Sequence, residues 1–249
     1  KMKILHIKDK LSQLGVKMED ITLGDYDMIS KFTAEKQRSP NDPLFKSVGC
    51  FYTPNRERAI LICSLMKQYN LKTCLEIGFG RGYTSLCVAK YLHDMGIDGK
   101  ITSIDPNFDQ NQLSLLQKVY PNQWFSKIQL LQGTSADVVP TLNEKFDLIY
   151  VDGDHSYEGT KLDWEMCKDK FTTIMVFDDY HLPSKSDPGI QCAKAINEIN
   201  EEQESCLEKE LIIGDRRIFV DDRQYTDEQI DYGQIVLTKK NAVLIDELW

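Results

Sequence analysis

The segment KTCLEIGFGRG, residues 72–82, decides the fold of this chain. A short apolar run leads into Glu76, and three glycines (Gly78, Gly80 and Gly82) follow at a spacing of two. The next residues, 83–89, place apolar side chains at helical intervals. This order predicts a strand, a tight glycine turn and a helix. In that arrangement a parallel sheet presents backbone N–H groups to a ligand at a helix N-terminus.

The spacing of the glycines argues against a dinucleotide as the ligand. The dinucleotide fingerprint is G-x-G-x-x-G, and here the third glycine comes one residue early. Glu76, at the tip of the strand, would repel a pyrophosphate but would attract an ammonium group. A second strand, residues 101–105, ends in Asp105, and an acid at that tip commonly accepts hydrogen bonds from ribose hydroxyls. Both acids favour S-adenosylmethionine, an adenosine with a cationic amino-acid tail, over NAD.

These residues resemble the class I S-adenosylmethionine-dependent methyltransferases, and the resemblance covers roughly residues 50–249. It implies that the E-x-G-x-G-x-G loop wraps the methionine part of the cofactor and that Asp105 binds the ribose. It also implies a position beside the adenine for Ser135, which is alternatively a plain helix N-cap. The predicted cofactor-binding set is Glu76, Gly78, Gly80, Thr84, Asp105, Pro106, Ser135, Ala136 and Asp152.

Near-continuous apolar strands alternate with helices along the rest of the chain. This pattern predicts an α/β fold, in which a doubly wound and mostly parallel sheet is covered on both faces. With the resemblance, the expected architecture is a seven-stranded, Rossmann-like methyltransferase fold. Residues 1–52 are predicted to form an N-terminal helical cap or lid, and residues 53–249 the S-adenosylmethionine-binding methyltransferase domain.

Acidic residues follow two further predicted strands. Residues 146–151 run into DGDHSYEG at 152–159, and residues 173–177 run into DDYH at 178–181. Ligands of such sheets lie outside the carboxyl ends of the strands, so we expect Asp152, Asp178 and Asp179 to face one another. Carboxylates so close repel unless a cation neutralises them. An all-oxygen set suits Mg²⁺ or another divalent cation.

This pattern resembles the metal-dependent small-molecule O-methyltransferases of the catechol type, and more closely the macrocin-type sugar O-methyltransferases. The resemblance implies that Asp152, Asp178 and Asp179 are metal ligands, with Asp179 where the catechol type has asparagine. It also places His155 where the catechol enzymes have a lysine base. The predicted catalytic residues are His155 and Asp152, with His181 as the rival base. Helix capping is the alternative role for the adjacent aspartates, and Asp154 is expected to cap or orient a neighbour.

The expected reaction is direct in-line transfer of a methyl group to a hydroxyl of a sugar, phenol or natural product. The net charge of -9 over 249 residues disfavours a long nucleic acid as partner. Seven cysteines without C-x-x-C spacing indicate a reducing compartment, and no apolar run is long enough for a membrane span. We therefore expect a cytoplasmic enzyme with a small-molecule acceptor, and the sequence is compatible with a homo-oligomer.

Two other functions fit parts of the sequence. The apolar run that ends in Asp152-Gly153-Asp154 is also typical of a metal-dependent nucleotide-sugar glycosyltransferase, although that function leaves the glycine turn without a purpose. A non-catalytic module that binds S-adenosylmethionine is the second alternative. The acid trio together with His155 argues against it, because binding alone does not need them.

Overall fold

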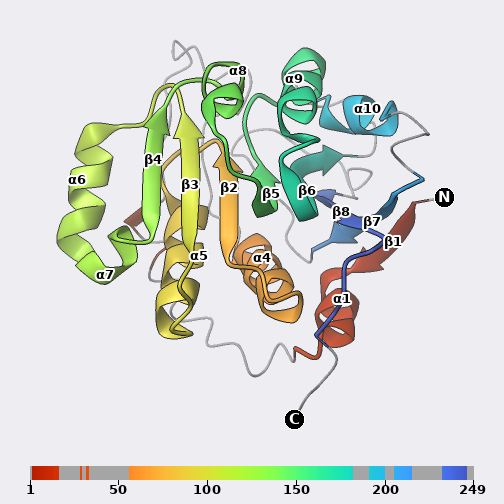
Figure 1. Ribbon diagram of the computed structural model, residues 1–249, viewed down its shortest axis with the longest axis horizontal. Coiled ribbons are helices and arrows are strands. Elements are labelled where there is room, and N and C mark those ends of the chain that lie inside the picture. Colours follow the sequence, from red (N-terminus) through yellow and green to blue (C-terminus); the bar gives the residue numbers. More distant parts are fainter. Residues whose placement is uncertain are drawn as a thin grey trace, which may run out of the picture.

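The computed structural model describes residues 2–16, 29, 32–33, 56–181, 191–199, 205–214 and 232–245. Within these residues the chain forms an eight-stranded sheet in the order β1-β7-β8-β6-β5-β2-β3-β4 (Figure 1). The strands are β1 (Lys3–His6), β2 (Thr73–Ile77), β3 (Lys100–Asp105), β4 (Ile128–Gln132), β5 (Phe146–Val151), β6 (Phe171–His181), β7 (Leu207–Ile213) and β8 (Tyr232–Lys239). The helices are α1 (Ile7–Gln13), α4 (Arg56–Gln68), α5 (Tyr83–Asp94), α6 (Gln110–Val119), α7 (Asn122–Phe125), α8 (Ser135–Val138), the short 3₁₀ turn η2 (Val139–Thr141), α9 (Tyr157–Cys167) and α10 (Cys192–Asn197).

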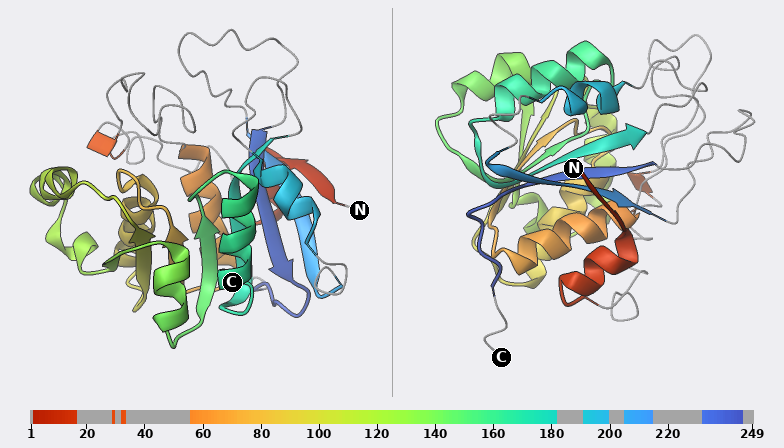
Figure 2. Two further views of the ribbon diagram at one scale, coloured as in Figure 1. Left: turned by 90° about the horizontal axis from the view of Figure 1, so that it is seen from above. Right: turned by 90° about the vertical axis from the view of Figure 1, so that its right-hand side faces the viewer.

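The sheet is parallel except at β8, which runs antiparallel to both β6 and β7. Helices form a layer on each face, with α1, α4 and α5 on one side and α8, α9 and α10 on the other (Figure 2). This arrangement confirms the predicted α/β fold with a doubly wound, mostly parallel sheet. None of the helices in the described part of the chain combines the length and the apolar composition that crossing a bilayer requires.

Side chains alternate between the two layers along each central strand, and this alternation builds two cores. Leu148 and Tyr150 of β5 pack in the core on the α4–α5 side. Ile149 and Val151 point the other way, into the core that includes residues of α9 and α10. Burial on both faces explains why the strands are nearly continuous apolar runs.

The order of the strands reverses between β2 and β5. From β2 the chain moves outward to β3 and β4, then returns to β5 beside β2 and moves the other way to β6. Ligands of open parallel sheets bind in the crevice at such a switch point, outside the carboxyl ends of the strands. The tips of β2 and β5 are therefore the place where the fold itself favours a ligand.

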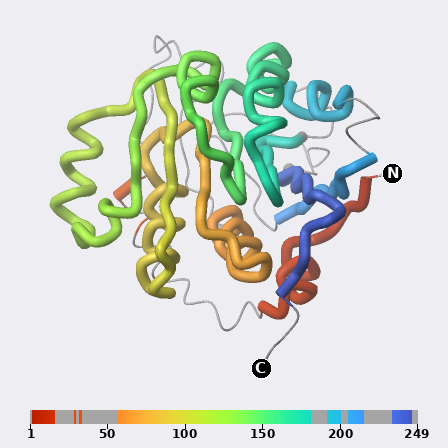
Figure 3. The backbone as a smooth tube through the Cα atoms, viewed as in Figure 1, coloured from red at the N-terminus to blue at the C-terminus, as the bar shows by residue number. Residues whose placement is uncertain are grey.

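The sheet has one strand more than the predicted seven. The additional strand is β1, which pairs in parallel with β7 from Lys3↔Glu210 to His6↔Ile213, at the edge of the sheet opposite β4 (Figure 3). The sequence pattern predicted helix through this stretch, but the helix begins only at Ile7, after His6, whose Nδ1 accepts a hydrogen bond from the Lys8 N–H. Most of the remaining predicted cap, to residue 52, lies outside the described residues, so the cap stays a prediction.

Candidate active site

The glycine turn after β2 lies at the switch point and contacts the tip of β5. All three glycines have positive φ angles: 95° at Gly78, 53° at Gly80 and 87° at Gly82. A Cβ atom on Gly78 would lie 2.1 Å from the backbone oxygen of Asp152, so no larger residue fits there. At Gly80 an added Cβ would meet no atom of the described residues within 4 Å. The turn is therefore packed on one side against β5 and open on the other, where a ligand has room.

The two acids predicted to bind the cofactor have different surroundings. Asp105 holds the turn, because its carboxylate accepts from the N–H of Gly80 at 2.9 Å and from the N–H of Asn107 at 2.7 Å. Glu76 is only 1% exposed and lies in the layer between sheet and helix, where it accepts hydrogen bonds from the hydroxyls of Ser85 and Ser103. Burial raises the pKa of Glu76 to about 7, although both hydroxyls oppose the rise.

The remaining predicted cofactor residues lie around the same edge of the sheet. Thr84 is buried in the first turn of α5, whereas Pro106 and Ala136 are exposed. Ser135 is buried, and its hydroxyl donates to a carboxylate oxygen of Asp163 on α9, an acid whose pKa burial raises to about 6. The N-cap of α8 is Thr134, in a reciprocal capping box with Asp137. The Ser135 side chain therefore has a partner within the protein, and capping is the role of its neighbour.

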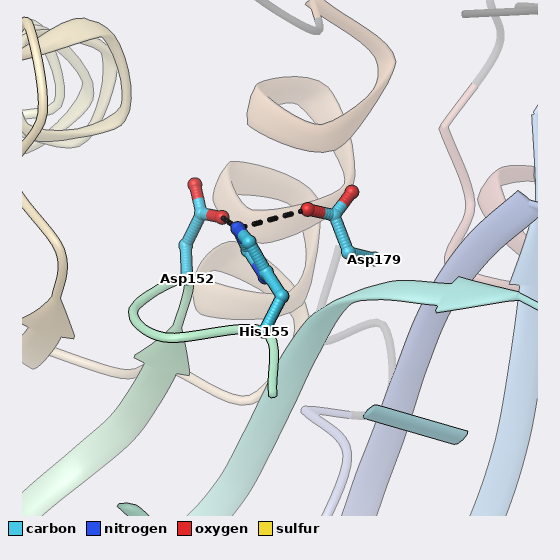
Figure 4. Close-up of side chains that lie close together, drawn as sticks. All are labelled: Asp152, His155 and Asp179. Atoms are coloured by element: carbon cyan, nitrogen blue, oxygen red, sulfur yellow. Dashed lines mark ion pairs between the residues drawn. The ribbon is translucent and has the colours of Figure 1, made fainter. Parts of the chain in front are cut away.

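Three side chains from the tips of β5 and β6 form a cluster (Figure 4). The Nε2 atom of His155 lies 3.1 Å from a carboxylate oxygen of Asp179 and 3.8 Å from one of Asp152. One ligand atom from each of the three lies within 4.8 Å of the others. The side chains are 11–17% exposed, so the cluster is sheltered yet reachable from solvent. We call Asp152, His155 and Asp179 the acid–imidazole cluster.

A bulge in β6 brings Asp179 to this cluster. The register between β6 and β8 shifts between Phe177 and Tyr180, and Asp179 has a left-handed φ of 53°. Phe177 and Tyr180 both belong to the core on the α9 side, although they are three residues apart. A regular strand would place Phe177 and Tyr180 on opposite faces, so Asp179 is the additional residue at the bulge.

Asp178 lies outside the acid–imidazole cluster, although the sequence predicted it as a metal ligand. Asp178 follows Ile174 and Val176 on the face of β6 that packs against the α4–α5 side, and it is 3% exposed. One carboxylate oxygen accepts from Arg58 and the other from the Gln234 amide at 2.7 Å. Burial acts to raise the pKa of Asp178, but Arg58 and Gln234 outweigh burial and hold it at about 2. His155 takes the place in the cluster that Asp178 was expected to occupy.

The charges of the cluster are unbalanced. Burial raises the pKa of Asp152 well above its usual range, with repulsion from Asp178 and Asp179 adding to the effect and Arg58 opposing it. For His155 burial alone would lower the pKa, but Asp179, Cys192 and Asp152 together outweigh burial and raise it well above 6.5. The surrounding carboxylates therefore favour a positive charge at this position, either a proton on His155 or an added cation.

The donor set fits a divalent cation. Two carboxylates and one imidazole nitrogen converge, and their combined negative charge favours any added positive charge. An imidazole ligand suits Mn²⁺, Zn²⁺ or Fe²⁺ better than Mg²⁺, which prefers oxygen ligands. The other ring nitrogen of His155 faces the thiol of Cys192 at 3.9 Å, and the backbone oxygen of His155 accepts from the Gln191 N–H at 2.8 Å. The start of α10 thus holds the histidine loop in place.

Two further sequence predictions concern Asp154 and His181. Asp154 accepts a hydrogen bond from the backbone N–H of Ser156, the residue that caps α9, and is not a member of the acid–imidazole cluster. It therefore has the local orienting role expected for it. His181 ends β6, and its side chain lies outside the described part of the chain.

Sequence reasoning missed Arg58 and Gln234. Both hold Asp178, and neither belongs to a motif. One signal was available for Arg58: it lies in the first turn of the helix that precedes β2. Because that helix runs antiparallel to the strand, its N-terminus lies at the edge of the sheet where the strands end. No comparable signal marks Gln234, which comes from the antiparallel strand β8.

Comparison with known proteins agrees with this geometry. A family model described as "Methyltransferase domain" matches residues 75–180, which run from β2 to the tip of β6 and so include both the glycine turn and the acid–imidazole cluster. No curated protein matches the chain.

Solved structures with the same fold include several methyltransferases. The O-methyltransferase TomG from Streptomyces achromogenes, solved with S-adenosylmethionine, is 15% identical over 94% of this chain and 95% of its own, with a TM-score of 0.56. An O-methyltransferase from Bacillus cereus, solved with S-adenosylhomocysteine, is 11% identical over 94% and 97%, with a TM-score of 0.57. A methyltransferase of Podospora anserina, also bound to S-adenosylhomocysteine, is 15% identical over 87% and 88%, with a TM-score of 0.54.

The predicted methyltransferase fold is thereby confirmed. The sheet carries the glycine turn and the acid–imidazole cluster at the switch point between β2 and β5. The chain has the fold of these methyltransferases, and its residues 75–180 match the model of a methyltransferase domain.

Proposed function

We propose that this protein transfers the methyl group of S-adenosylmethionine to a hydroxyl oxygen of a small molecule. The observation that carries the proposal is the contact between the glycine turn and the tip of β5. No residue larger than glycine fits at position 78, because Gly78 packs against the backbone of Asp152, a member of the acid–imidazole cluster. A cofactor bound over the turn would therefore have its reactive end near two carboxylates and an imidazole.

The proposed roles follow from the hydrogen bonds. Methyl transfer from a sulfonium requires an aligned acceptor and removal of its proton, with little covalent help from the protein. Asp179 orients the ring of His155, whose Nε2 atom faces the cluster and, while no cation is bound there, accepts the proton of the acceptor hydroxyl. Asp105, which already holds the turn through Gly80, is placed to receive the ribose hydroxyls.

We further propose that the cluster of Asp152, His155 and Asp179 holds a divalent cation. A cation there would lower the pKa of an acceptor hydroxyl, whose proton would then pass to solvent, because Nε2 of His155 would bind the cation and could not accept that proton. This set replaces the three aspartates predicted from the sequence, because Asp178 is held by Arg58 and Gln234. The imidazole favours a transition ion such as Mn²⁺, while Mg²⁺ stays the alternative.

The donor is tested by calorimetry with S-adenosylhomocysteine, with UDP-sugars as the comparison. We expect S-adenosylhomocysteine to bind and UDP-sugars not to bind. Binding of a UDP-sugar alone would instead support the glycosyltransferase, for which the outward position of Asp154 offers no support.

The reaction is tested by transfer of a labelled methyl group to a panel of phenols, sugars and natural-product alcohols. The assay is run with EDTA and then with added Mn²⁺ or Mg²⁺. Turnover that EDTA stops and Mn²⁺ restores is the expected result. Turnover that EDTA leaves unchanged would remove the cation from the proposal, and tight cofactor binding without any turnover would favour a non-catalytic module. A cytoplasmic location and self-association stay predictions.

A further inference from the structure

Five side chains at the tips of β5 and β6 carry more negative than positive charge. Three are the aspartates at 152, 178 and 179, one is the guanidinium of Arg58, and one is the imidazole of His155. With a neutral imidazole, three carboxylates face one fixed positive charge. The way in which Arg58 divides its contacts therefore decides which carboxylates still need a cation.

Arg58 is built into the protein interior. It is 4% exposed, comes from the first turn of α4, and lies with its guanidinium carbon 5.4 Å from the centre of the Tyr150 ring. One of its nitrogens, Nη1, contacts Asp178 and also lies 3.1 Å from an oxygen of Asp152. The guanidinium of Arg58 thus joins the tips of β5 and β6, through aspartates that lie 94 and 120 positions later in the sequence.

The contacts use one oxygen of Asp152 and both oxygens of Asp178. Asp152 gives Oδ2 to Arg58, and its Oδ1 faces His155. Asp178 gives Oδ2 to Arg58 and Oδ1 to Gln234. Both oxygens of Asp178 therefore accept from Arg58 or Gln234, whereas Oδ1 of Asp152 faces His155.

We infer that Arg58 is a positioning residue that acts as the built-in cation of the β5 and β6 tips. Its guanidinium offsets the charge of the Asp178 carboxylate and binds one of the two carboxylate oxygens of Asp152. An added divalent cation would therefore bind only at Asp152, His155 and Asp179. A buried ion pair that loses one partner leaves an uncompensated charge. Without Arg58, the carboxylates of Asp152 and Asp178 would need another cation, and a metal ion could meet that need.

This inference deepens the proposed function, on which it rests for the cation at the cluster, but its test measures no methyl transfer. The wild type is compared with Arg58→Met, which keeps the length and loses the charge, and with Arg58→Lys as the matched control that keeps the charge. The readouts are the thermal midpoint and Mn²⁺ binding by calorimetry, in cofactor-free protein. If the protein transferred no methyl group, the proposed function would be refuted. The thermal midpoint and Mn²⁺ binding would still test the role of Arg58.

We expect the midpoint of Arg58→Met without metal to fall by roughly 6–12 °C. Saturating Mn²⁺ should restore most of that loss, and Mn²⁺ should bind Arg58→Met at least about tenfold more tightly than the wild type. Arg58→Lys should resemble the wild type in both readouts. An Arg58→Met variant that folds only with Mn²⁺ also supports the inference. A variant that Mn²⁺ does not stabilise, or that stays unfolded at every Mn²⁺ concentration, overturns it.

A second test compares the Mn²⁺ affinity of two variants, Asp179→Asn and Asp178→Asn, with that of the wild-type protein. Asp179→Asn should weaken Mn²⁺ binding by about tenfold or more, because it removes a member of the cluster. Asp178→Asn should change it by less than about threefold. Equal losses in the two variants would show that Asp178 is a ligand after all, and the inference would then be wrong.

Discussion

The donor side and the acceptor side of the site are held together by different forces. On the donor side, Glu76 accepts from two hydroxyls and Asp105 accepts from two backbone N–H groups, so each acid is satisfied by neutral donors close by. On the acceptor side, Asp152, Asp178 and Asp179 depend on the charges of Arg58 and His155. Hydrogen bonds from neutral groups hold the side chains of the donor side in place, whereas ion pairs hold those of the acceptor side. The two should therefore respond to different substitutions.

The largest effect is expected on the acceptor side, from His155→Ala. Loss of the proposed base should lower turnover by about 10²–10⁴-fold. The affinity for S-adenosylhomocysteine should stay unchanged, because the donor side does not depend on His155. Steady-state kinetics and calorimetry measure the two quantities, and His93→Ala, at an exposed position of α5, is the control. Unchanged turnover would remove His155 from the mechanism.

A pair of glycine variants should break the donor side in two distinguishable ways. Gly78→Ala places a Cβ against the Asp152 backbone at a positive φ, and should lower the free energy of unfolding by roughly 2–4 kcal/mol. Gly80→Ala meets open space and should cost about 1 kcal/mol. Both should lose affinity for S-adenosylhomocysteine, Gly80→Ala because its methyl group enters the ligand space. Full affinity in Gly80→Ala would place the cofactor elsewhere.

The buried carboxyl of Glu76 makes a pH test of the donor side possible. Its pKa of about 7 in the folded protein exceeds the ordinary 4.5, so the folded state binds more protons between these values. The stability that Glu76 contributes is therefore complete below pH 4.5 and is lost as the pH rises to about 7. Relative to wild type, Glu76→Gln should gain up to about 3 kcal/mol over this interval.

Denaturant unfolding of cofactor-free protein at a series of pH values measures this gain. Glu158→Gln, at an exposed position of α9, serves as the control and should follow the wild type. Parallel stability curves for Glu76→Gln and wild type would mean that Glu76 is ionised in the folded protein throughout.

The smallest effect is expected for Ser135→Ala. Its hydroxyl donates to the buried Asp163, so the variant should lose roughly 1–2 kcal/mol of stability. The affinity for S-adenosylhomocysteine should change by less than about threefold. Denaturant unfolding and calorimetry check the two values. A larger loss of affinity would support the adenine contact predicted from the sequence.

The contrast between the two sides also explains what the sequence could and could not predict. The strand at 73–77, the glycine turn and Asp105 are contiguous or adjacent in the sheet, and backbone rules locate them. The edge strand β1 was not predicted, because four residues at the edge of a sheet carry little periodicity and pair with residues 207 positions later. The tips of β5 and β6 were predicted correctly as a place where acids gather, but the partners of each acid were not.

The reason is that ion pairing at those tips depends on distant residues. Nothing near Asp178 in the sequence indicates that Arg58 and Gln234 hold it. Nor does a run of two aspartates show that a bulge separates them, because the left-handed φ of Asp179 depends on the shift between β6 and β8. His155 was recognised from its neighbours, but its raised pKa comes chiefly from Asp179, on another strand.

The bulge in β6 has a consequence for how such a protein can evolve. It assigns one aspartate to the framework and its neighbour to the chemistry, so that substitution of one leaves the other in place. A descendant can exchange Asp179 or His155, and with them its acceptor or its need for a cation, while Asp178 and Arg58 keep the strands aligned. Two consecutive identical residues thus have separate roles, one in joining the strands and one in the acid–imidazole cluster.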